Sequence, residues 1–351
     1  NIVELEEKLK SMKPEELDGK TLESCKGKGL SDEAIANFLG MKPVDVHRNR
    51  EALGIKPVFR VVDTCAAEFE AVSSYYYSSY GWENEVIFSP GSKGKIVVIG
   101  SGPIRIGQGI EFDYCSVHCI MTLKKLGYEA VIINNNPETV STDYDISDRL
   151  YFEPLTPEYL LNILDIEKPE GAIVQFGGQS AIKLAKTVHQ SGYKILGTGF
   201  EAINMAEDRE EFDDILGKLG ISRPAGHTVF TVEEAAEAAG RLGYPVLVRP
   251  SYVLGGQGME IAYNREDMVE YINIVNRVKQ EHPVLIDKYI PGREIEVDAV
   301  CDGKDILIPG IMEHIERAGI HSGDSISVYP APGLPENVTR QVEEWTARIV
   351  E

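Results

Sequence analysis

The residues with the clearest chemical potential lie in the stretch VLVRPSYVLGGQGMEI, residues 246–261. Arg249 ends a run of apolar β-formers, at a position where a guanidinium can bind two phosphate oxygens at once. Gly255, Gly256 and Gly258 follow, and such a backbone can approach a ligand closely and point its N–H groups at it. The spacing fits a flap over phosphates and fits equally well a mobile hairpin with a surface arginine.

Two later features favour the phosphate interpretation. The segment PVLIDKYI ends a strand with Asp287 and Lys288, and such an edge can bind adenine through main-chain groups. Glu294, Glu296 and Asp298 then alternate along EIEVDAV, which places them on one face of a strand. Solvent is the common partner of such carboxylates, and ribose hydroxyls or a magnesium-loaded nucleotide are the functional alternative.

A second glycine-rich loop, GSGPIRIGQG, begins at Gly100 between a predicted strand and a predicted helix. Its spacing is GxGxxxxG and not the GxGxxG of dinucleotide-binding folds. The next strand ends in Asn134, Asn135 and Asn136, where such a fold needs an acid for the ribose. These two departures disfavour NAD, although N–H groups at a helix N-terminus can still bind an anion.

The composition limits the class of protein. The chain has 351 residues, enough for two or three domains, and a formal net charge of −21. This charge disfavours binding to nucleic acid and to anionic membranes. No apolar run is long enough to span a bilayer. Five sparsely spaced cysteines suit free thiols in a reducing compartment, so we expect a soluble cytoplasmic protein.

The elements that must position these residues fall into three segments. Residues 1–85 are predicted to be helical and irregular. Within them, AIANFLGMKPVDVHRNREALG resembles a DNA-binding helix-turn-helix, but the net charge favours a plain two-helix packing unit. A linker from Ser89 leads to strands expected at 95–100, 129–136, 171–178 and 194–197, and helices at about 111–126, 157–168 and 180–191. This alternation indicates a parallel sheet with right-handed crossovers.

From about Asp208 the pattern changes to an antiparallel α+β fold. Thr231 and Glu234 form a predicted capping box at the start of one of its helices. The fold class is therefore α/β and α+β. We expect three domains, a helical one at 1–90, a parallel-sheet one at 91–207 and an α+β one at 208–351.

Four long motifs, in fixed order, closely resemble the large-chain family of carbamoyl phosphate synthetases. They are GSGPIRIGQGIEFDYCSVHC, NNNPETVSTDYDISDRLYFEP, VRPSYVLGGQGMEI and IMEHIERAGIHSGDS. In that family two ATP-grasp halves act in turn, the first making carboxyphosphate from bicarbonate and the second phosphorylating carbamate. This chain resembles the second half, because a helical region with VDTCAAEF precedes its parallel sheet. The 91–207 segment would then be a pre-ATP-grasp domain, followed by a partial ATP-grasp fold with its lid at about 215–290.

The resemblance implies a role for several residues. Arg249 would contact phosphate and act in catalysis, and Glu294 would hold the ribose. Lys288 and Ile290 would line the adenine site. The full implied nucleotide site consists of Arg209, Arg249, Gly255, Gly256, Lys288, Ile290, Glu294, Gly319, Ile320, His321 and Ser322.

The resemblance also implies cofactors and partners. They are ATP with Mg²⁺ or Mn²⁺, a small glutaminase subunit, the first synthetase half, an allosteric domain and further copies of the parent. The family's metal ligands are expected beyond Glu351, so we expect no metal ligand in this chain and no activity from it alone. The product would feed arginine and pyrimidine biosynthesis. The alternatives are another ATP-grasp carboxylase or ligase, such as a biotin carboxylase relative, and a non-catalytic oligomerisation or binding fragment.

Overall fold

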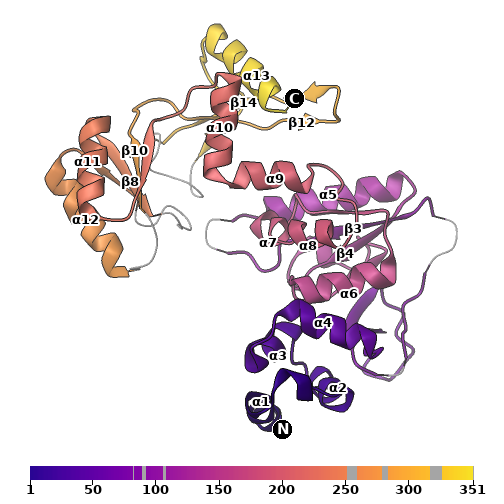
Figure 1. Ribbon diagram of the computed structural model, residues 1–351. Coiled ribbons are helices and arrows are strands. Elements are labelled where there is room, and N and C mark those ends of the chain that lie inside the picture. Colours follow the sequence, from indigo (N-terminus) through magenta and orange to yellow (C-terminus); the bar gives the residue numbers. More distant parts are fainter. Residues whose placement is uncertain are drawn as a thin grey trace. The chain divides into compact units, whose positions relative to one another are not determined.

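The computed structural model describes residues 1–81, 83–88, 92–105, 108–250, 259–278, 284–316 and 326–350. The chain divides into two compact units (Figure 1). Unit 1 comprises Asn1–Ile104 and Ile110–Asn204, and unit 2 comprises Arg105–Gly109 and Met205–Glu351. Within the described ranges, no helix combines the length and the apolarity needed to cross a membrane.

Unit 1 begins with a small helical bundle. Its elements are α1 (Ile2–Ser11), the 3₁₀ helix η1 (Pro14–Glu16), α2 (Gly19–Gly27), α3 (Asp32–Leu39) and α4 (Pro43–Ala52). Ser31 caps α3 by accepting a hydrogen bond from the Ala34 N–H at 3.0 Å, and Gly40 ends the helix in the left-handed conformation. Leu9, Leu22 and Ile35 form the centre of the apolar core that the helices share.

A six-stranded sheet with the order β1-β2-β5-β4-β3-β6 forms the rest of unit 1. Its strands are β1 (Val58–Val61), β2 (Tyr75–Ser79), β3 (Lys95–Ile99), β4 (Glu129–Ile133), β5 (Arg149–Tyr151) and β6 (Gly171–Ile173). All neighbours are parallel except β1 and β2. The connecting helices are α5 (Glu111–Lys125), α6 (Pro157–Glu167), α7 (Gly178–Ile182), α8 (Ala185–Gln190) and α9 (Phe200–Glu207), and η2 (Val140–Thr142) is a 3₁₀ turn. The predicted parallel sheet is confirmed.

Helices cover both faces of this sheet, which explains its nearly continuous apolar strands. Along β3, Val97 and Ile99 belong to one buried cluster with residues of α6, α7 and α8. Ile96 and Val98 point the other way and pack with Ile120 of α5. Alternation along the strand therefore divides one short sequence between two cores.

Three sequence expectations for unit 1 need correction. Residues 1–85 are not only helical and irregular, because β1 and β2 add an antiparallel pair to the sheet. The expected strand at 194–197 is reduced to a single bridge between Ile195 and Ala172. The expected helix at 180–191 is split into α7 and α8. The hydroxyl-rich strand YYYSS lacks the apolar alternation that identifies a strand in sequence.

Unit 2 contains a four-stranded antiparallel sheet with the order β7-β10-β8-β9. The strands are β7 (Gly226–Val229), β8 (Val246–Pro250), β9 (Glu260–Ala262) and β10 (Val284–Lys288), and helices α11 (Val232–Leu242) and α12 (Arg265–Val278) lie on one of its faces (Figure 1). The predicted capping box is confirmed, since Thr231 Oγ1 accepts from the Glu234 N–H at 3.1 Å and Glu234 Oε2 accepts from the Thr231 N–H at 3.3 Å.

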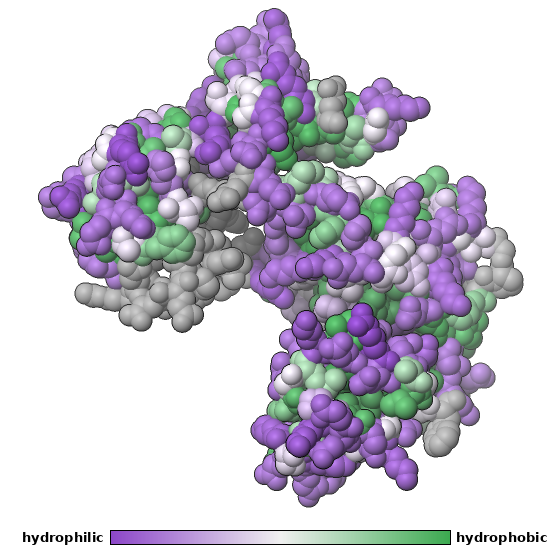
Figure 2. Space-filling view, in the orientation of Figure 1, coloured by the Kyte–Doolittle hydropathy of each residue, from purple (hydrophilic) through white to green (hydrophobic). Residues whose placement is uncertain are grey.

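The remaining elements of unit 2 are two helices and two small sheets. The helices α10 (Arg209–Leu219) and α13 (Glu336–Val350) contact each other. The strands are β11 (Ile295–Val297), β12 (Val300–Cys301), β13 (Ile306–Leu307), β14 (Ile311–His314) and β15 (Ser327–Val328). Hydrophilic residues cover most of the visible face of both units, in keeping with a chain of formal net charge −21 (Figure 2).

Candidate functional site

A slot of about 560 Å³ lies in unit 2 between α10 and the four-stranded sheet β7-β10-β8-β9, which we call the lid sheet. One wall is the face of the sheet that α11 and α12 leave uncovered. Its lining residues are Ala206, Glu207, Phe212, Asp213, Leu216, Arg223, Pro224, Leu247, Arg249, Leu285, Asp287, Lys288, Tyr289 and Ile290. Both its volume and its mostly apolar lining with a few charged groups are typical of a small-molecule site.

Strand register explains which side chains reach the slot. Leu285 lies opposite Arg249, and Asp287 lies opposite Leu247, so these four side chains share one face of the antiparallel pair. The intervening residues Val246, Val248, Val284 and Ile286 point to the other face, where they are buried against α11 and α12. The sheet therefore presents two leucines, one guanidinium and one carboxylate to the slot.

Arg249 is held in place by Asp287. Its Nε donates a hydrogen bond to Asp287 Oδ2 at 3.0 Å, and the side chains are 39% and 13% exposed, respectively. A guanidinium carries five N–H donors, so a carboxylate that fixes one edge leaves donors for a second anion. The sequence-based candidate Arg249 thus lies in the slot, in a geometry suited to a phosphate group.

The opposite wall comes from α10 and the segment that follows it. Phe212, Asp213 and Leu216 lie one helical turn apart or less and line the slot together. Arg223, beyond the end of α10, forms an ion pair with Asp213, with Nη2 2.7 Å from Oδ2. This wall therefore repeats the chemistry of the sheet wall, with apolar side chains beside a paired arginine and aspartate.

The predicted adenine-site residues Lys288 and Ile290 also line the slot. The Lys288 ammonium, however, donates to the carbonyls of Gly243 at 2.7 Å and Tyr244 at 3.3 Å. The side chain thus ties the end of β10 to the turn between α11 and β8. In this arrangement Lys288 can contact a ligand only through its main chain. The sequence resemblance likewise implies main-chain contacts to the base.

The structure does not place the other predicted residues in this slot. Glu294 precedes β11, where its carbonyl accepts from the His314 N–H at 2.9 Å, and it is absent from the described lining. Arg209 begins α10, but its side chain lies outside the described part of the chain. The same holds for the whole of Gly255, Gly256, Gly319, Ile320, His321 and Ser322.

The sequence reasoning missed Asp213, Arg223 and Phe212 as members of the site. Asp213 and Arg223 are ten positions apart and separated by a helix end, so no helical or strand period links them. The only available signal was that both lie near the start of the segment that resembles an ATP-grasp lid. Their proximity follows from the chain reversal after Leu219.

The Gly100 loop is packed against the asparagines that follow β4. The Gly102 N–H donates to Asn134 Oδ1 at 3.2 Å. A Cβ at Gly100 would lie 2.7 Å from Asn134 Nδ2, too close for any side chain. These glycines therefore allow close approach of the asparagine amide, which gives a packing reason for glycine at this position.

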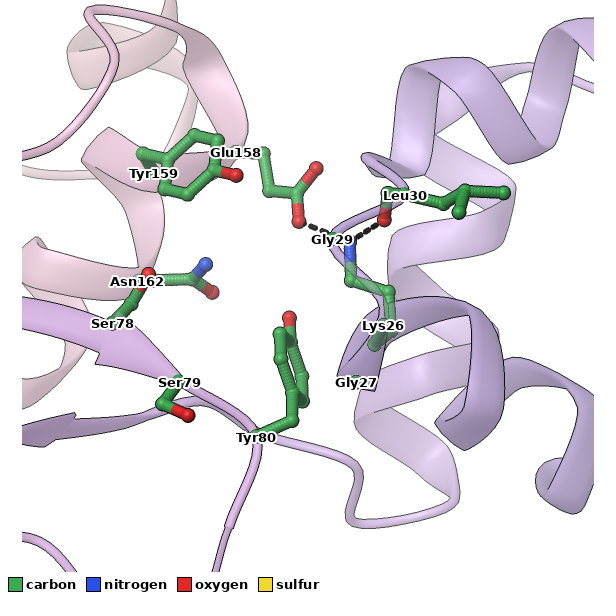
Figure 3. A pocket seen from close by; sticks show the side chains of 10 residues that line it. All are labelled: Lys26, Gly27, Gly29, Leu30, Ser78, Ser79, Tyr80, Glu158, Tyr159 and Asn162. Atoms are coloured by element: carbon green, nitrogen blue, oxygen red, sulfur yellow. Dashed lines mark hydrogen bonds and ion pairs between the residues drawn. The ribbon is translucent and has the colours of Figure 1, made fainter. Parts of the chain in front are cut away.

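A second cavity of about 160 Å³ lies within unit 1, where the helical bundle meets the sheet domain (Figure 3). Lys26, only 2% exposed, contacts Glu158 of α6 and Asp32 Oδ1, the latter at 3.0 Å, and donates to the Leu30 carbonyl at 2.9 Å. The Tyr80 side chain points into the space, and its hydroxyl has no partner among the described residues. Burial raises the pKa of this hydroxyl, which therefore stays protonated.

Asp32 and Arg50 lie at the same junction of the bundle and the sheet domain, and their contacts bear on the helix-turn-helix alternative. Arg50 is fully buried and binds Asp32 Oδ2 through Nη2 at 3.2 Å and Asn162 Oδ1 at 3.2 Å. Burial alone would raise the pKa of Asp32, but a hydrogen bond with His47 and the charges of Lys26 and Arg50 outweigh it and lower the pKa to about 2. Arg50 is thus held inside the bundle and is unavailable to DNA, which favours the predicted two-helix packing unit.

The charged side chains of the slot fit a nucleotide better than a metal ion. Apolar side chains on two facing walls suit a flat base. A guanidinium at the edge of the slot suits a phosphate group. Two of its carboxylates, Asp213 and Asp287, are each paired with an arginine. In the described part of the chain, no group of three or more His, Cys, Asp or Glu side chains is arranged to hold a metal.

The fold resembles that of biotin carboxylases. The biotin carboxylase domain of 2-oxoglutarate carboxylase from Hydrogenobacter thermophilus, solved with MgADP, ADP and bicarbonate, matches 73% of this chain and 58% of its own, with a TM-score of 0.56 and 20% identity. A biotin carboxylase from Campylobacter jejuni matches 74% of this chain and 59% of its own, with a TM-score of 0.56 and 17% identity. These likenesses define the class, an ATP-grasp fold.

Sequence comparison then defines the family. Three family models match in tandem: the oligomerisation domain of the carbamoyl-phosphate synthetase large chain at 1–54, the carbamoyl phosphate synthase pre-ATP-grasp domain at 92–205, and the carbamoyl-phosphate synthase L chain ATP-binding domain at 208–351. The chain is 56% identical over 348 residues to the carbamoyl phosphate synthase large chain of Clostridium beijerinckii, and 57% over 350 residues to that of Agathobacter rectalis. It belongs to the carbamoyl phosphate synthase large-chain family, and it spans 32% of the length of these two relatives.

Proposed function

We propose that this chain forms part of the second synthetic unit of a carbamoyl phosphate synthetase, which uses ATP to phosphorylate carbamate. The nitrogen of carbamate would come from glutamine or ammonia and its carbon from bicarbonate. The observation that carries this proposal is the slot between the lid sheet and α10, with Arg249 fixed at its wall by Asp287. This slot lies in the segment that matches the ATP-binding domain of the family.

The proposed phosphoryl transfer needs little covalent catalysis by the protein. A carbamate oxygen attacks the γ-phosphorus in line, an O–P bond forms, the bond to the β-phosphate oxygen breaks, and ADP leaves. Arg249 would hold the phosphates in position and neutralise charge on them, which is the main protein contribution to phosphoryl transfer. Mg²⁺ or Mn²⁺, when bound, would supply further charge neutralisation, and the sequence resemblance puts its ligands beyond Glu351.

Two observations support the second unit over its alternatives. Residues 1–54 match the family's oligomerisation domain, which precedes the second half according to the sequence resemblance. The identity to the two relatives covers 99% and 100% of this chain, whereas the likeness to biotin carboxylases rests on 17–20% identity.

The parent would then be a cytoplasmic enzyme with a small glutaminase subunit, the first synthetase half, an allosteric domain and further copies of itself as partners. Its product would enter arginine and pyrimidine biosynthesis.

The test is an Arg249→Ala substitution in the complete parent enzyme. A charge-assisted hydrogen bond is worth about 1.5–3 kcal/mol, so we expect the formation of ATP from ADP and carbamoyl phosphate to slow roughly 10- to 150-fold. Synthesis of carbamoyl phosphate should fall by a similar factor. Both rates are measured by coupled assays.

Arg241→Ala is the matched control. Arg241 lies on α11, is 63% exposed and pairs only with the neighbouring Glu237 among the described residues. Its removal should leave both rates within a factor of two. If Arg249→Ala made ATP at the rate of the control, Arg249 would have no role at a phosphate and the proposed site would be wrong.

A further inference from the structure

We propose that Arg223, held by Asp213, binds the nucleoside part of the nucleotide and helps to set the affinity of this slot for it. The proposal rests on the proposed function, since it assumes that the slot takes a nucleotide. It assigns a role to the second arginine–aspartate pair, on the wall opposite Arg249. The ligand class is a base with its ribose, and the phosphates are left to Arg249.

The position of Arg223 along the slot separates it from Arg249. Residues 223 and 224 lead into β7, beside the end of β10, where the Lys288 N–H donates to the Ala225 carbonyl at 2.8 Å. Arg249 instead lies opposite Leu285, three residues earlier on β10. Strands rise about 3.3 Å per residue, so the Ala225 position is roughly 10 Å from that of Arg249 along the strand, and Arg223 lies two residues beyond Ala225. The two arginines therefore stand toward different ends of the slot, and an extended ligand such as a nucleotide with its phosphates can reach both guanidiniums.

The contacts of Arg223 leave donors for a ligand. Nη2 pairs with Asp213 Oδ2 at 2.7 Å, and Nη1 donates to the Pro224 carbonyl at 3.3 Å. Among the described residues Nε makes no contact, and the side chain remains 36% exposed. A carboxylate on one edge fixes the plane of the guanidinium, so little rotamer freedom is lost when another edge donates to a base nitrogen or a ribose oxygen.

The neighbouring side chains explain why a base would lie at this end. Phe212 and Leu216 of α10 face the slot from the same wall as Arg223, and Leu216 is 8% exposed. Leu247 supplies an apolar surface from the sheet. A flat, apolar base with ring-nitrogen acceptors can bury its faces between these side chains and accept from the Arg223 guanidinium at its edge.

The experiment measures the formation of ATP from ADP and carbamoyl phosphate by the complete enzyme, which is the reverse of the step assigned to this unit under the proposed function. We compare Arg223→Gln, Arg223→Lys, Arg249→Ala and the surface control Arg241→Gln. The readouts are KM for ADP, kcat, and the inhibition constants of adenosine and pyrophosphate as competitors. Adenosine probes the nucleoside end of the slot, and pyrophosphate probes the phosphate end.

For Arg223→Gln we expect KM for ADP and the adenosine inhibition constant to rise about tenfold, with kcat and the pyrophosphate constant unchanged. Arg223→Lys keeps the ion pair with Asp213 and should give a smaller rise, which separates a ligand contact from a folding defect. Arg249→Ala should have the opposite effect. Its inhibition constant for pyrophosphate should rise, and its inhibition constant for adenosine should stay unchanged. Arg241→Gln should match the wild type.

Two results would overturn this inference while the proposed function stands. In the first, the adenosine inhibition constant of Arg223→Gln equals that of the wild type, while Arg249→Ala has lost its inhibition by pyrophosphate. The other is a wild-type enzyme that adenosine does not inhibit, because the nucleoside end would then contribute no affinity. If Arg249→Ala also leaves every constant unchanged, the proposed function itself fails.

Discussion

Removal of the buried Lys26 ammonium should detach the helical bundle from the sheet domain. In unit 1, Lys26 of α2 contacts Glu158 of α6 and Asp32 of α3, and its side chain is 2% exposed while that of Glu158 is 11% exposed. Glu158 also accepts from the Asp32 N–H at 2.6 Å. The Lys26→Met substitution keeps the aliphatic stem and removes only the charge, so it leaves a buried carboxylate without its cation.

The size of the effect follows from this burial. Breaking one partner of a buried pair costs about 3–5 kcal/mol, whereas an exposed pair is worth less than about 1 kcal/mol. The opening equilibrium of α2 and α3 should therefore rise on the order of 10²- to 10³-fold, because each 1.4 kcal/mol or so is tenfold. Replacing both charges, in Lys26→Met with Glu158→Gln, should recover at least half of the loss, since no unpaired charge then remains in the pair.

Hydrogen exchange of the amides in residues 19–39, followed by mass spectrometry, measures this opening directly. Lys56→Met is the control, because Lys56 is 60% exposed and its contact with Glu51 at 2.7 Å is superficial. The exchange of α2 and α3 should accelerate in Lys26→Met and stay close to wild type in Lys56→Met. Equal exchange in the two single variants would show that the junction of the bundle and the sheet domain is not held by this ion pair, and the reasoning from burial would be refuted.

Two further predictions concern unit 1. The pKa of Asp32 is lowered to about 2 from 3.8, so its stabilisation is present above about pH 4 and is lost as the pH falls toward 2. The free energy of unfolding, measured with urea, should therefore fall by about 2 kcal/mol more in the wild type than in Asp32→Asn between pH 5 and pH 2. Equal falls of this free energy in the two proteins would contradict the prediction. Gly177→Ala would bring its Cβ within 2.4 Å of the Ile99 carbonyl oxygen, so the melting temperature should fall by several degrees, a loss of about 2 kcal/mol or more. Gly27→Ala, whose Cβ would meet nothing within 4 Å, should melt near wild type, and an equal fall in both variants would exclude the clash as the cause.

The sequence predicted the strongly periodic elements well. Strands β3, β4 and β6 are short apolar runs between turn residues, and α5 and α6 follow at the expected spacing. These features depend on local preference and on burial of both sheet faces, which leave a clear pattern in the residues. The strand β2, which lies between β1 and β5, was missed, because tyrosine and serine hydroxyls hide its alternation.

For the site, the sequence alone determined the residue types and the order of motifs, and these were enough to single out Arg249, Lys288 and Ile290. Only the tertiary structure decided how these residues are used. It turned the Lys288 ammonium toward the carbonyls of Gly243 and Tyr244, and it brought Arg223 to Asp213 across the end of α10. The physical reason is that strand alternation fixes which side chains share a face, whereas the partner across a slot or a chain reversal depends on how separate elements pack.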